Sequence, residues 1–252
     1  MDLQSTTAIV TGAASGLGAA TARALTERGA RVYGLDLPAA VDEAEPVDGV
    51  TLLPTDVTEP AQVQAAVDSA AADERPLRTV VNCAGIGPSM RLLGRKGPHD
   101  LDVYRKVVEV NLIGTFNVLT LAAEAIAATE ADADGQRGVA VNTASIAAYD
   151  GQIGQAAYAS SKGGVVGLTL PAARDLASSG IRVCTIAPGI VDTPMLATVS
   201  EEFRAGLAAG IPFPQRLARS AEYARLVLMI IEHDYLNGET IRMDGALRMA
   251  PR

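Results

Sequence analysis

The chain has 252 residues, of which 48% are hydrophobic and 24 are glycines, enough for one large core with no need of a second domain. Its net charge of −8, from 21 basic and 29 acidic residues, argues against a surface that binds nucleic acid. The two cysteines and two histidines lack metal-ligand spacing, and no uninterrupted apolar run approaches the roughly 18 residues of a membrane span.

Short β-rich runs alternate with Ala-rich helical stretches along the whole chain. We predict strands at Thr6–Thr11, Arg31–Leu35, Val50–Pro54, Thr79–Asn82, Gly138–Thr143, Ile181–Ala187 and Glu239–Met243. We predict helices at Gly16–Arg28, Pro60–Asp73, Asp102–Thr129, Ala156–Ser178 and Ala221–Glu232. This alternation with short connections indicates right-handed βαβ units. We therefore expect one α/β domain over residues 1–252, a Rossmann fold whose doubly wound, mostly parallel seven-stranded sheet has helices on both faces.

Two long segments interrupt this alternation. The first, Gly87–Asp100, carries Arg91, Arg95, Lys96 and His99, and the second, Gly189–Gln215, holds three prolines around a possible short helix. Long loops in compact domains usually serve a function or are mobile. We place a cofactor-binding half at about 1–150 and a catalytic and substrate half at about 140–252.

A glycine-rich turn joins the first predicted strand to the first predicted helix. Glycines let the backbone approach a pyrophosphate, and a helix N-terminus offers amide donors and positive potential. The strand–turn–helix context makes this a strong signal for a dinucleotide site. The predicted contacts are Gly12, Ser15, Gly16, Leu17 and Gly18.

Asp36 ends the second predicted strand, 18 residues beyond Gly18. A carboxylate there can bind the ribose hydroxyls and would repel a 2′-phosphate. No Arg or Lys lies at Ala13–Ser15 or directly after Asp36 to pair with such a phosphate. The sequence therefore favours NAD over NADP, although Asp36 could instead cap a turn at the end of the strand.

Two further strand ends supply candidate cofactor contacts. Asp56 and Val57 follow the third strand and could meet the adenine ring, with an Asx turn as the equally plausible alternative. Asn82, Ala84 and Gly85 end the fourth strand and offer an open floor of small residues. Open parallel sheets bind ligands at such carboxyl ends. Cys83 beside them, like Cys184, lies in an apolar run typical of reduced core cysteines.

Tyr158 and Lys162 form the strongest catalytic signal. A phenol has an unperturbed pKa of about 10, and an ammonium one helical turn away makes its phenolate accessible nearer neutral pH. Such a group can take the proton of an alcohol as its hydride leaves. Alone, this spacing usually marks a solvated helix face, but Ser145 lies 13 residues upstream of Tyr158 and the chain also has the glycine-rich turn.

These motifs, with Asn111 and Pro188-Gly189, resemble the short-chain dehydrogenase/reductase superfamily in order and spacing over the whole chain. One departure is Cys83, where many members have a second Asn. Further segments, including Gly151–Tyr158, Ile211–Leu217 and Asn237–Ala246, resemble the type II 3-hydroxyacyl-CoA dehydrogenases, a branch also described as 17β-hydroxysteroid dehydrogenases of broad substrate range. The likeness is weaker around Pro38–Gly49 and Met195–Gly210.

The resemblance implies a role for each motif residue. Tyr158 is the general base for alcohol oxidation, Lys162 lowers its pKa and binds the nicotinamide ribose, and Ser145 holds the substrate oxygen. Asn111 would fix a water that links Lys162 to solvent, or else relieve a local kink in its helix. The nicotinamide would lie against the loop that contains Pro188, Gly189, Val191 and Thr193. Gln152 and Gln155 would contact the substrate or cap the helix that follows.

The implied reaction is NAD-dependent oxidation of a 3-hydroxyacyl-CoA to the 3-oxoacyl-CoA, in which Arg91, Arg95 and Lys96 could meet the CoA phosphates. The simpler alternative is that these charges are solvated. Rival functions are a 3-oxoacyl-carrier-protein reductase, a steroid or small-alcohol dehydrogenase, and a non-catalytic NAD-binding scaffold. The start Met-Asp, with Arg23 as the first basic residue, is unlike a targeting signal, so we expect a cytoplasmic protein. Helices Asp102–Thr129 and Ala156–Ser178 are apolar on more than one face, which predicts a partner surface. The resemblance implies that such helices pair within a homotetramer.

Overall fold

The computed structural model describes residues 1–95, 97–196 and 200–251. Its main sheet has seven strands in the order β11-β8-β7-β4-β1-β2-β3, and every neighbouring pair is parallel. The strands are β1 Thr7–Thr11, β2 Arg31–Asp36, β3 Val50–Pro54, β4 Leu77–Asn82, β7 Gly138–Thr143, β8 Ile181–Pro188 and β11 Thr240–Met243. The predicted fold class is thus confirmed.

Strand order reverses between β1 and β4. From β1 the chain builds outward through β2 and β3, then returns to pair β4 with the other edge of β1 and continues through β7, β8 and β11. In an open parallel sheet, ligands bind outside the carboxyl ends of the strands at such a switch point. The segments that follow Thr11 and Asn82, which are register partners, therefore flank the expected crevice.

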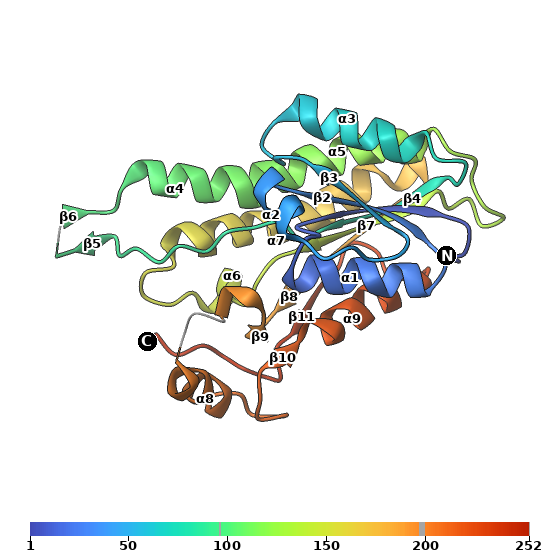
Figure 1. Cartoon of the computed structure of the whole chain (residues 1–252). Helices are drawn as coiled ribbons and strands as arrows, with labels where there is room; N and C mark the ends of the chain where they lie inside the picture. The colour runs from blue at the N-terminus through green and yellow to red at the C-terminus, as the bar shows by residue number, and fades with distance from the viewer. Residues whose placement is uncertain (96, 197–199, 252) are drawn as a thin grey trace.

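Helices cover both faces of the sheet (Figure 1). One layer contains α3 (Pro60–Ala71), α5 (Gly114–Ala127) and α7 (Ala156–Asp175), and the other contains α1 (Gly16–Glu27) and α9 (Ser220–Glu232). The period of two in each strand divides its side chains between these layers. In β4, for example, Val80 packs in the first core cluster and Val81 in the second. Because helices cover both faces of the sheet, the side chains on both sides of each strand are buried. This explains the uncharged runs of the sequence.

The predicted helix Asp102–Thr129 is not regular. It consists of α4 (Leu101–Val108), a π-helical turn η1 (Glu109–Ile113) and α5. The predicted long helix is confirmed as one continuous helical segment, and the wide turn at its centre, which contains Asn111, was not predicted. Single π turns inside helices are frequent at functional sites, and here the turn brings Asn111 toward β4.

The same helix, Leu101–Ala127, is long and apolar enough to cross a membrane when judged by length and composition alone, because a window of 18 residues within it has a mean hydropathy of 1.5. Its α5 part carries Val118, Leu119, Ala122 and Ile126, all of which are buried in the core against the sheet. A core helix of an α/β domain meets the same criterion, because it is covered by protein on one side.

Several short elements lie outside the predicted helices and strands or, like the turn Ala177–Ser179, at the end of a predicted helix. They are α2 Pro38–Glu43, β5 Leu93–Gly94, β6 Gly97–Pro98, α6 Ala147–Asp150, a 3₁₀ turn Ala177–Ser179, β9 Val191–Asp192, a 3₁₀ turn Pro194–Leu196, α8 Glu201–Ala209 and β10 Ala218–Arg219. The short helix expected in the second loop is confirmed as α8, and the Ser200 hydroxyl caps it by accepting from the Phe203 N–H at 3.2 Å. Residues 197–199 of that loop lie outside the described part of the chain.

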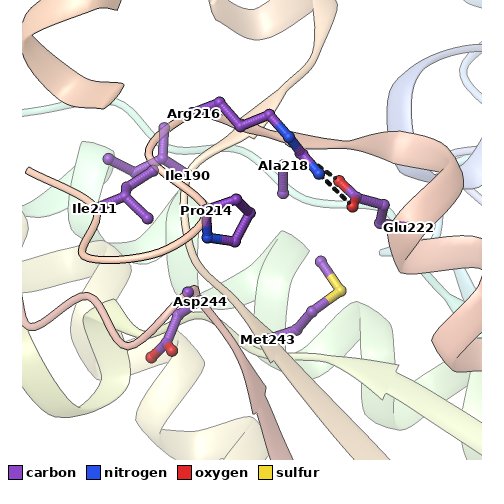
Figure 2. A pocket seen from close by; sticks show the side chains of 9 residues that line it. Ile190, Ile211, Pro214, Arg216, Ala218, Glu222, Met243 and Asp244 are labelled. Atoms are coloured by element: carbon purple, nitrogen blue, oxygen red, sulfur yellow. Dashed lines mark hydrogen bonds and ion pairs between the residues drawn. The ribbon is translucent and has the colours of Figure 1, made fainter. Parts of the chain in front are cut away.

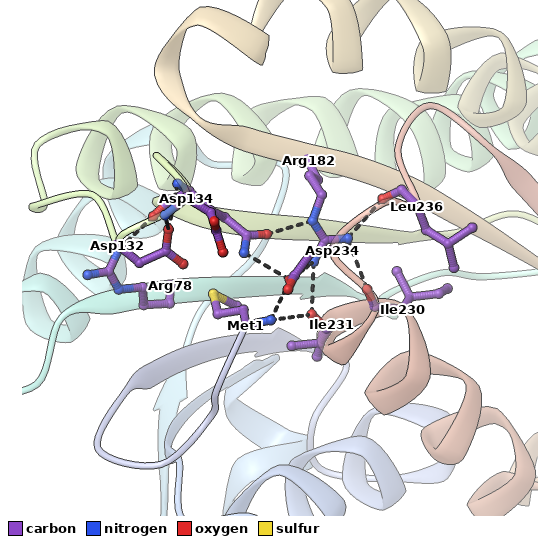
Figure 3. A network of polar contacts seen from close by, with 10 residues as sticks. Met1, Arg78, Asp132, Asp134, Arg182, Ile230, Ile231, Asp234 and Leu236 are labelled. Atoms are coloured by element: carbon purple, nitrogen blue, oxygen red, sulfur yellow. Dashed lines mark hydrogen bonds and ion pairs between the residues drawn. The ribbon is translucent and has the colours of Figure 1, made fainter.

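A buried guanidinium ties β8 to the end of α9 (Figure 3). Arg182 is 7% exposed and donates to Gln136 Oε1 at 2.6 Å. It also donates to the carbonyl oxygens of Ile230, Ile231 and Leu236 at 2.8 to 2.9 Å. The last carbonyls of a helix lack partners within the helix, and a cation at this end is favoured by the helix dipole. Arg182 therefore fixes α9 against the sheet.

Candidate active site

Three of the four predicted catalytic side chains come together at the carboxyl ends of β7 and its neighbours, and the fourth, Asn111, is described below. Ser145 follows β7 and is 8% exposed, while Tyr158 is half-buried in the first turn of α7. Lys162 lies one turn further along α7, with Nζ 6.0 Å from the centre of the Tyr158 ring. The spacing of four residues on a helix places both side chains on one face, as the sequence predicted.

Burial sets the charge states of this pair. It raises the pKa of Tyr158, and the hydrogen bond with the Ser145 hydroxyl partly opposes this effect. It lowers the pKa of Lys162 to about 8, with the Cys83 thiol acting in the opposite direction. The ammonium Nζ donates to the Thr143 carbonyl oxygen at 2.7 Å, which is a charge-assisted bond. A proton can therefore be lost from this site close to the physiological pH range.

Asn111 holds the segment that faces Lys162. Its Oδ1 accepts from the Ile86 N–H at 2.8 Å, and its Nδ2 donates to the Ile86 carbonyl at 2.8 Å and to Ser161 Oγ at 3.0 Å. A Cβ added to Gly85 would lie 3.1 Å from Asn111 Oδ1 and 3.5 Å from Lys162 Nζ. The side chain is fully buried and engaged in structure, so its expected role with a water stays a prediction.

The glycine-rich turn has the shape that a dinucleotide requires. Gly12 has φ +66°, and a Cβ there would lie 3.0 Å from the Ala84 amide nitrogen. A Cβ on Gly18 would lie 2.1 Å from the Gly12 carbonyl oxygen, so no larger residue fits. The side chain of Ser15, the N-cap of α1, makes no cap hydrogen bond, and Leu17 packs partly into the core. The first turn of α1 thus leaves amide donors for a pyrophosphate.

Asp36 lies beside this turn at the end of β2. Its Oδ2 accepts from the Ala14 N–H at 2.9 Å and its Oδ1 from the Leu37 N–H at 2.9 Å. A carboxylate has about four acceptor positions, so these bonds orient it and leave capacity for ribose hydroxyls. Within residues 1–95, 97–196 and 200–251, no ion pair involves Asp36. The turn-capping and ribose-binding alternatives are therefore compatible.

The residues after β3 make hydrogen bonds within the protein at the position where the sequence predicts contact with the adenine ring. Asp56 Oδ1 accepts from the Thr58 N–H at 2.9 Å and from the Thr58 hydroxyl at 2.7 Å, which is the Asx-turn alternative. Val57 is 7% exposed, and its carbonyl accepts from Asn117 Nδ2 at 2.9 Å. These bonds place the Asp56–Val57 backbone rigidly at the crevice.

The floor after β4 is held by side chains that point inward. Asn82 is 2% exposed and donates through Nδ2 to Asn142 Oδ1 at 2.9 Å, so any cofactor contact of Asn82 would come from its backbone. Thr11 Oγ1 accepts from the amides of Cys83 and Ala84, both at 3.0 Å. Thr11 was not among the predicted site residues, although its position before Gly12 was a usable signal.

The loop after β8 closes the crevice from the opposite side. The Pro188 carbonyl accepts from the Ile146 N–H at 3.0 Å, and the Gly189 N–H donates to the Met243 carbonyl at 2.9 Å. Val191 is 7% exposed and belongs to β9, which pairs with β10. A Cβ on Gly16 would lie 3.7 Å from the Thr193 Cβ, so this loop reaches the glycine-rich turn.

A small cavity of about 130 Å³ lies behind this loop (Figure 2). Its lining includes Ile190, Pro214 and Met243, and a bidentate ion pair of Arg216 with Glu222 borders it, with both N···O distances 2.7 Å. Such a volume is far below the several hundred Å³ of a typical ligand pocket. The ion pair instead connects the segment before β10 to the start of α9.

The predicted substrate residues Gln152 and Gln155 serve the loop that leads to Tyr158. Gln152 Nε2 donates to the Ala250 carbonyl at 2.8 Å, and Gln155 Oε1 accepts from the Gln152 N–H at 3.0 Å. The sequence also missed a link on the other side of this loop, where the Met90 N–H donates to the Gly154 carbonyl at 2.8 Å. Contact of either glutamine with substrate stays a prediction.

Beyond Met90 the chain forms an exposed hairpin of β5 and β6, which extends past the body of the fold beside the start of α4 (Figure 1). Arg91, Leu93, Gly94 and Arg95 line an open hollow of about 550 Å³. Lys96, the third charge of this loop, lies outside the described residues. Because Met90 binds Gly154, the hairpin starts beside the loop that leads to Tyr158.

Comparison with known proteins gives matches over nearly the full chain. The family model described as short chain dehydrogenase matches residues 6–203. The 3-hydroxyacyl-CoA dehydrogenase type-2 of Drosophila melanogaster is 50% identical over 99% of this chain and 100% of its own length, and that of Homo sapiens is 50% identical over 97% and 95%. The crystal structure of 3-hydroxyacyl-CoA dehydrogenase type-2 from Mycobacterium avium superposes with a TM-score of 0.92 at 44% identity, covering 98% of both chains.

Proposed function

Since the chain belongs to the short-chain dehydrogenase family, whose enzymes use NAD or NADP, we propose that it transfers a hydride between NAD and a 3-hydroxyacyl-CoA, which becomes the 3-oxoacyl-CoA. The observation that carries the proposal is the likeness to proteins named 3-hydroxyacyl-CoA dehydrogenase type-2, at about half identity over nearly the whole length. The gathering of Ser145, Tyr158 and Lys162 supports an enzyme and not a cofactor-binding scaffold.

The chemistry divides between proton and hydride. Ser145 donates a hydrogen bond to the oxygen of the 3-hydroxyl and holds it toward Tyr158. Tyr158, as phenolate, takes the proton of the hydroxyl while the hydride leaves the carbon that bears this hydroxyl. Lys162 stabilises the phenolate through its positive charge, and the Thr143 carbonyl holds the ammonium in place. The bound nicotinamide supplies the acceptor for the hydride. In ketone reduction Tyr158 returns the proton.

The choice of NAD within this proposal rests on Asp36. Its carboxylate is oriented by two backbone amides at the end of β2, and the sequence places no basic residue at Ala13–Ser15 or at Leu37. A 2′-phosphate would meet an unneutralised negative charge at this point. Kinetic comparison of NADH with NADPH on one substrate tests this choice, and equal kcat/KM values would contradict it.

The hairpin supports the acyl-CoA assignment by charge and position. Arg91 and Arg95 are exposed on a hairpin that is anchored to the loop before Tyr158, and the phosphates of CoA are multiply charged anions. We expect the Arg91→Ala, Arg95→Ala double variant to raise KM for acetoacetyl-CoA several-fold. Its kcat should be nearly unchanged, because contacts to the CoA phosphates are equally strong in the bound substrate and in the transition state. Adding Lys96→Ala should enlarge the effect, and added salt should reduce it.

The control is the double variant Arg23→Ala, Arg225→Ala, which removes the same charge from exposed positions on α1 and α9. A small uncharged ketone serves as the control substrate. If the hairpin binds CoA phosphates, only the hairpin variant loses affinity, and only for the CoA substrate. Equal losses on both substrates would mean that the hairpin shapes the pocket, and no loss on either would mean that its charges are only solvated.

The rival substrates remain distinct in the same assays. A carrier-protein thioester replaces the CoA nucleotide with a folded acidic protein, and a steroid lacks phosphates altogether. A carrier-protein reductase or a steroid dehydrogenase would favour its own substrate over acetoacetyl-CoA by kcat/KM. The ratio of these values therefore separates the alternatives without any variant.

A further inference from the structure

A series of buried and partly buried polar groups connects Cys83 to the residue that holds Lys162. Cys83 Sγ lies 3.7 Å from the hydroxyl of Tyr223, which lies 2.7 Å from Thr143 Oγ1. Thr143 Oγ1 in turn lies 2.5 Å from the Asn82 carbonyl oxygen. The carbonyl of the same Thr143 accepts the hydrogen bond of the Lys162 ammonium. Tyr223 comes from α9 and is fully buried, and the chemistry above gives it no role.

The donors and acceptors in this series of polar groups allow one consistent assignment of the hydrogens. A carbonyl oxygen only accepts, so the single hydroxyl hydrogen of Thr143 goes to Asn82. The Tyr223 hydroxyl must then donate to Thr143 Oγ1, because that oxygen has only acceptor capacity left. The Tyr223 oxygen remains free to accept from the Cys83 thiol. Tyr223 therefore supplies a directed bond that Phe could not supply.

The hydrogen bond between Tyr223 and Thr143 lies just beyond the end of the β4–β7 ladder. The ladder between β4 and β7 ends at the pair Asn82 and Asn142, so Thr143 has no register partner in β4. On its other side Thr143 still pairs with Ile186 of β8. The bonds of the Thr143 side chain to Asn82 and Tyr223 thus replace the missing rung. Since the carbonyl and the side chain share one rigid residue, these bonds also fix where the carbonyl points.

We propose that Tyr223 of α9 is a positioning residue of the active site, which through Thr143 fixes the carbonyl that holds the Lys162 ammonium. The use of this lysine in turnover rests on the proposed function, whereas its placement by Thr143 does not. The link couples α9, which otherwise packs on the face of the sheet opposite α7, to the catalytic side chain on α7. Removal of the Tyr223 hydroxyl should therefore change the pKa of Lys162, although this hydroxyl does not itself bind the lysine.

The surroundings of Lys162 make this effect measurable. The titratable groups that face it are Tyr158 on α7 and Cys83 after β4, and the thiol of Cys83 is neutral at ordinary pH because burial raises its pKa. Among the residues that the structure describes, the hydrogen-bond acceptor of its ammonium is the Thr143 carbonyl. A displaced carbonyl stabilises the ammonium less and so lowers the pKa of Lys162 further. The direction of the change is thereby fixed in advance.

The test is a pH titration of the protein labelled with ¹³C at the lysine side chains, without cofactor or substrate. The chain has three lysines, Lys96, Lys106 and Lys162, and Lys→Arg changes at the first two assign the signals. In Tyr223→Phe the midpoint of the Lys162 signal should fall by on the order of half a pH unit or more relative to the unmodified protein. In turnover, kcat should fall on the order of ten-fold with KM little changed, since ground-state binding is untouched.

Four further variants separate positioning from general damage. Thr143→Val should reproduce the shift, and Thr143→Ser, which keeps the hydroxyl, should not. Cys83→Ala removes the far end of the series and a thiol that itself raises the pKa of Lys162, so its shift should be smaller than that of Tyr223→Phe. Tyr33→Phe removes a tyrosine hydroxyl that binds Asp73 at 3.1 Å elsewhere in the sheet and serves as the matched control.

Two results would overturn the proposal. One is a Lys162 midpoint in Tyr223→Phe equal to that in Tyr33→Phe. The other is a Cys83→Ala shift as large as the Tyr223→Phe shift, which would assign the effect to the thiol. If Tyr223→Phe does not fold, Thr143→Val against Thr143→Ser decides the question in the same way. Because the titration needs no substrate, an error in the proposed reaction would leave its result unaffected.

Discussion

Replacing Lys162 with Met should change the pH dependence of stability as well as abolish most turnover. Burial lowers the pKa of this lysine from its ordinary 10.5 to about 8, a difference that corresponds to roughly 3 kcal/mol. Lys162 is 3% exposed, so little solvent screening reduces this value. Methionine has a similar shape without the charge, and the variant therefore removes the ionisation while the helix remains packed.

The sign of the effect follows from proton uptake. Below pH 8 the lysine is protonated in both the folded and the unfolded chain, so the full cost of burying the ammonium is present. Between about pH 8 and 10.5 the unfolded chain binds one proton more than the folded chain, and the free energy of unfolding rises with pH. The methionine variant lacks this contribution. The free energy of unfolding of the unmodified protein, measured relative to that of the variant, should thus increase by roughly 2–3 kcal/mol between pH 7 and pH 10.

Urea unfolding of both proteins at several pH values, at one protein concentration, measures this difference. The comparison cancels every other titrating group that the two proteins share, and it does not depend on the fixed cost of leaving the Thr143 carbonyl without its donor. A stability difference that stays constant from pH 7 to pH 10 would refute the conclusion that Lys162 titrates near pH 8 in the folded protein.

Four more outcomes are expected. Tyr158→Phe should keep the melting temperature within a few degrees and lose most of kcat, and near-normal turnover would remove Tyr158 from its assigned role. Asp36→Ala should lower kcat/KM with NADH by removing ribose hydrogen bonds worth about 1–3 kcal/mol, and a preserved preference for NADH would show that other residues select the cofactor. Arg182→Leu should cost on the order of 3 kcal/mol in urea unfolding because it leaves buried carbonyls without donors, whereas Arg225→Leu, at an exposed position, should cost little. Light scattering should give the mass of a homotetramer, since Phe116 on α5 is 51% exposed and Leu170 on α7 is 45% exposed; a monomer at micromolar concentration contradicts this expectation.

The sheet and its helices were predictable because their patterns are local. Uncharged β-rich runs, Ala-rich helices and Gly29 after the first helix appear directly in the sequence, and parallel pairing follows from the alternation. The π turn around Asn111 was not predictable in this way. It depends on bonds from Asn111 to Ile86 and Ser161, which lie 25 and 50 residues away along the chain.

The site shows the same division. The spacing of Tyr158 and Lys162 on one helix face, and the position of Asp36 after a strand, are properties of short segments and could be predicted. The polar chain through Tyr223 joins residues 80 and 140 positions apart and has no sequence signature. The prediction for Gln152 and Gln155 could not anticipate that the loop would use both side chains for its own hydrogen bonds, because the partner Ala250 lies 98 residues from Gln152.

The central claim is tested most directly by one kinetic comparison on the unmodified protein. Reduction of acetoacetyl-CoA, of the matching carrier-protein thioester and of a steroid ketone is measured with NADH and with NADPH. The proposed function predicts the highest kcat/KM for acetoacetyl-CoA with NADH, and a much lower value for the same substrate with NADPH. A higher kcat/KM for the carrier-protein thioester with NADPH, or turnover of the steroid alone, would contradict it.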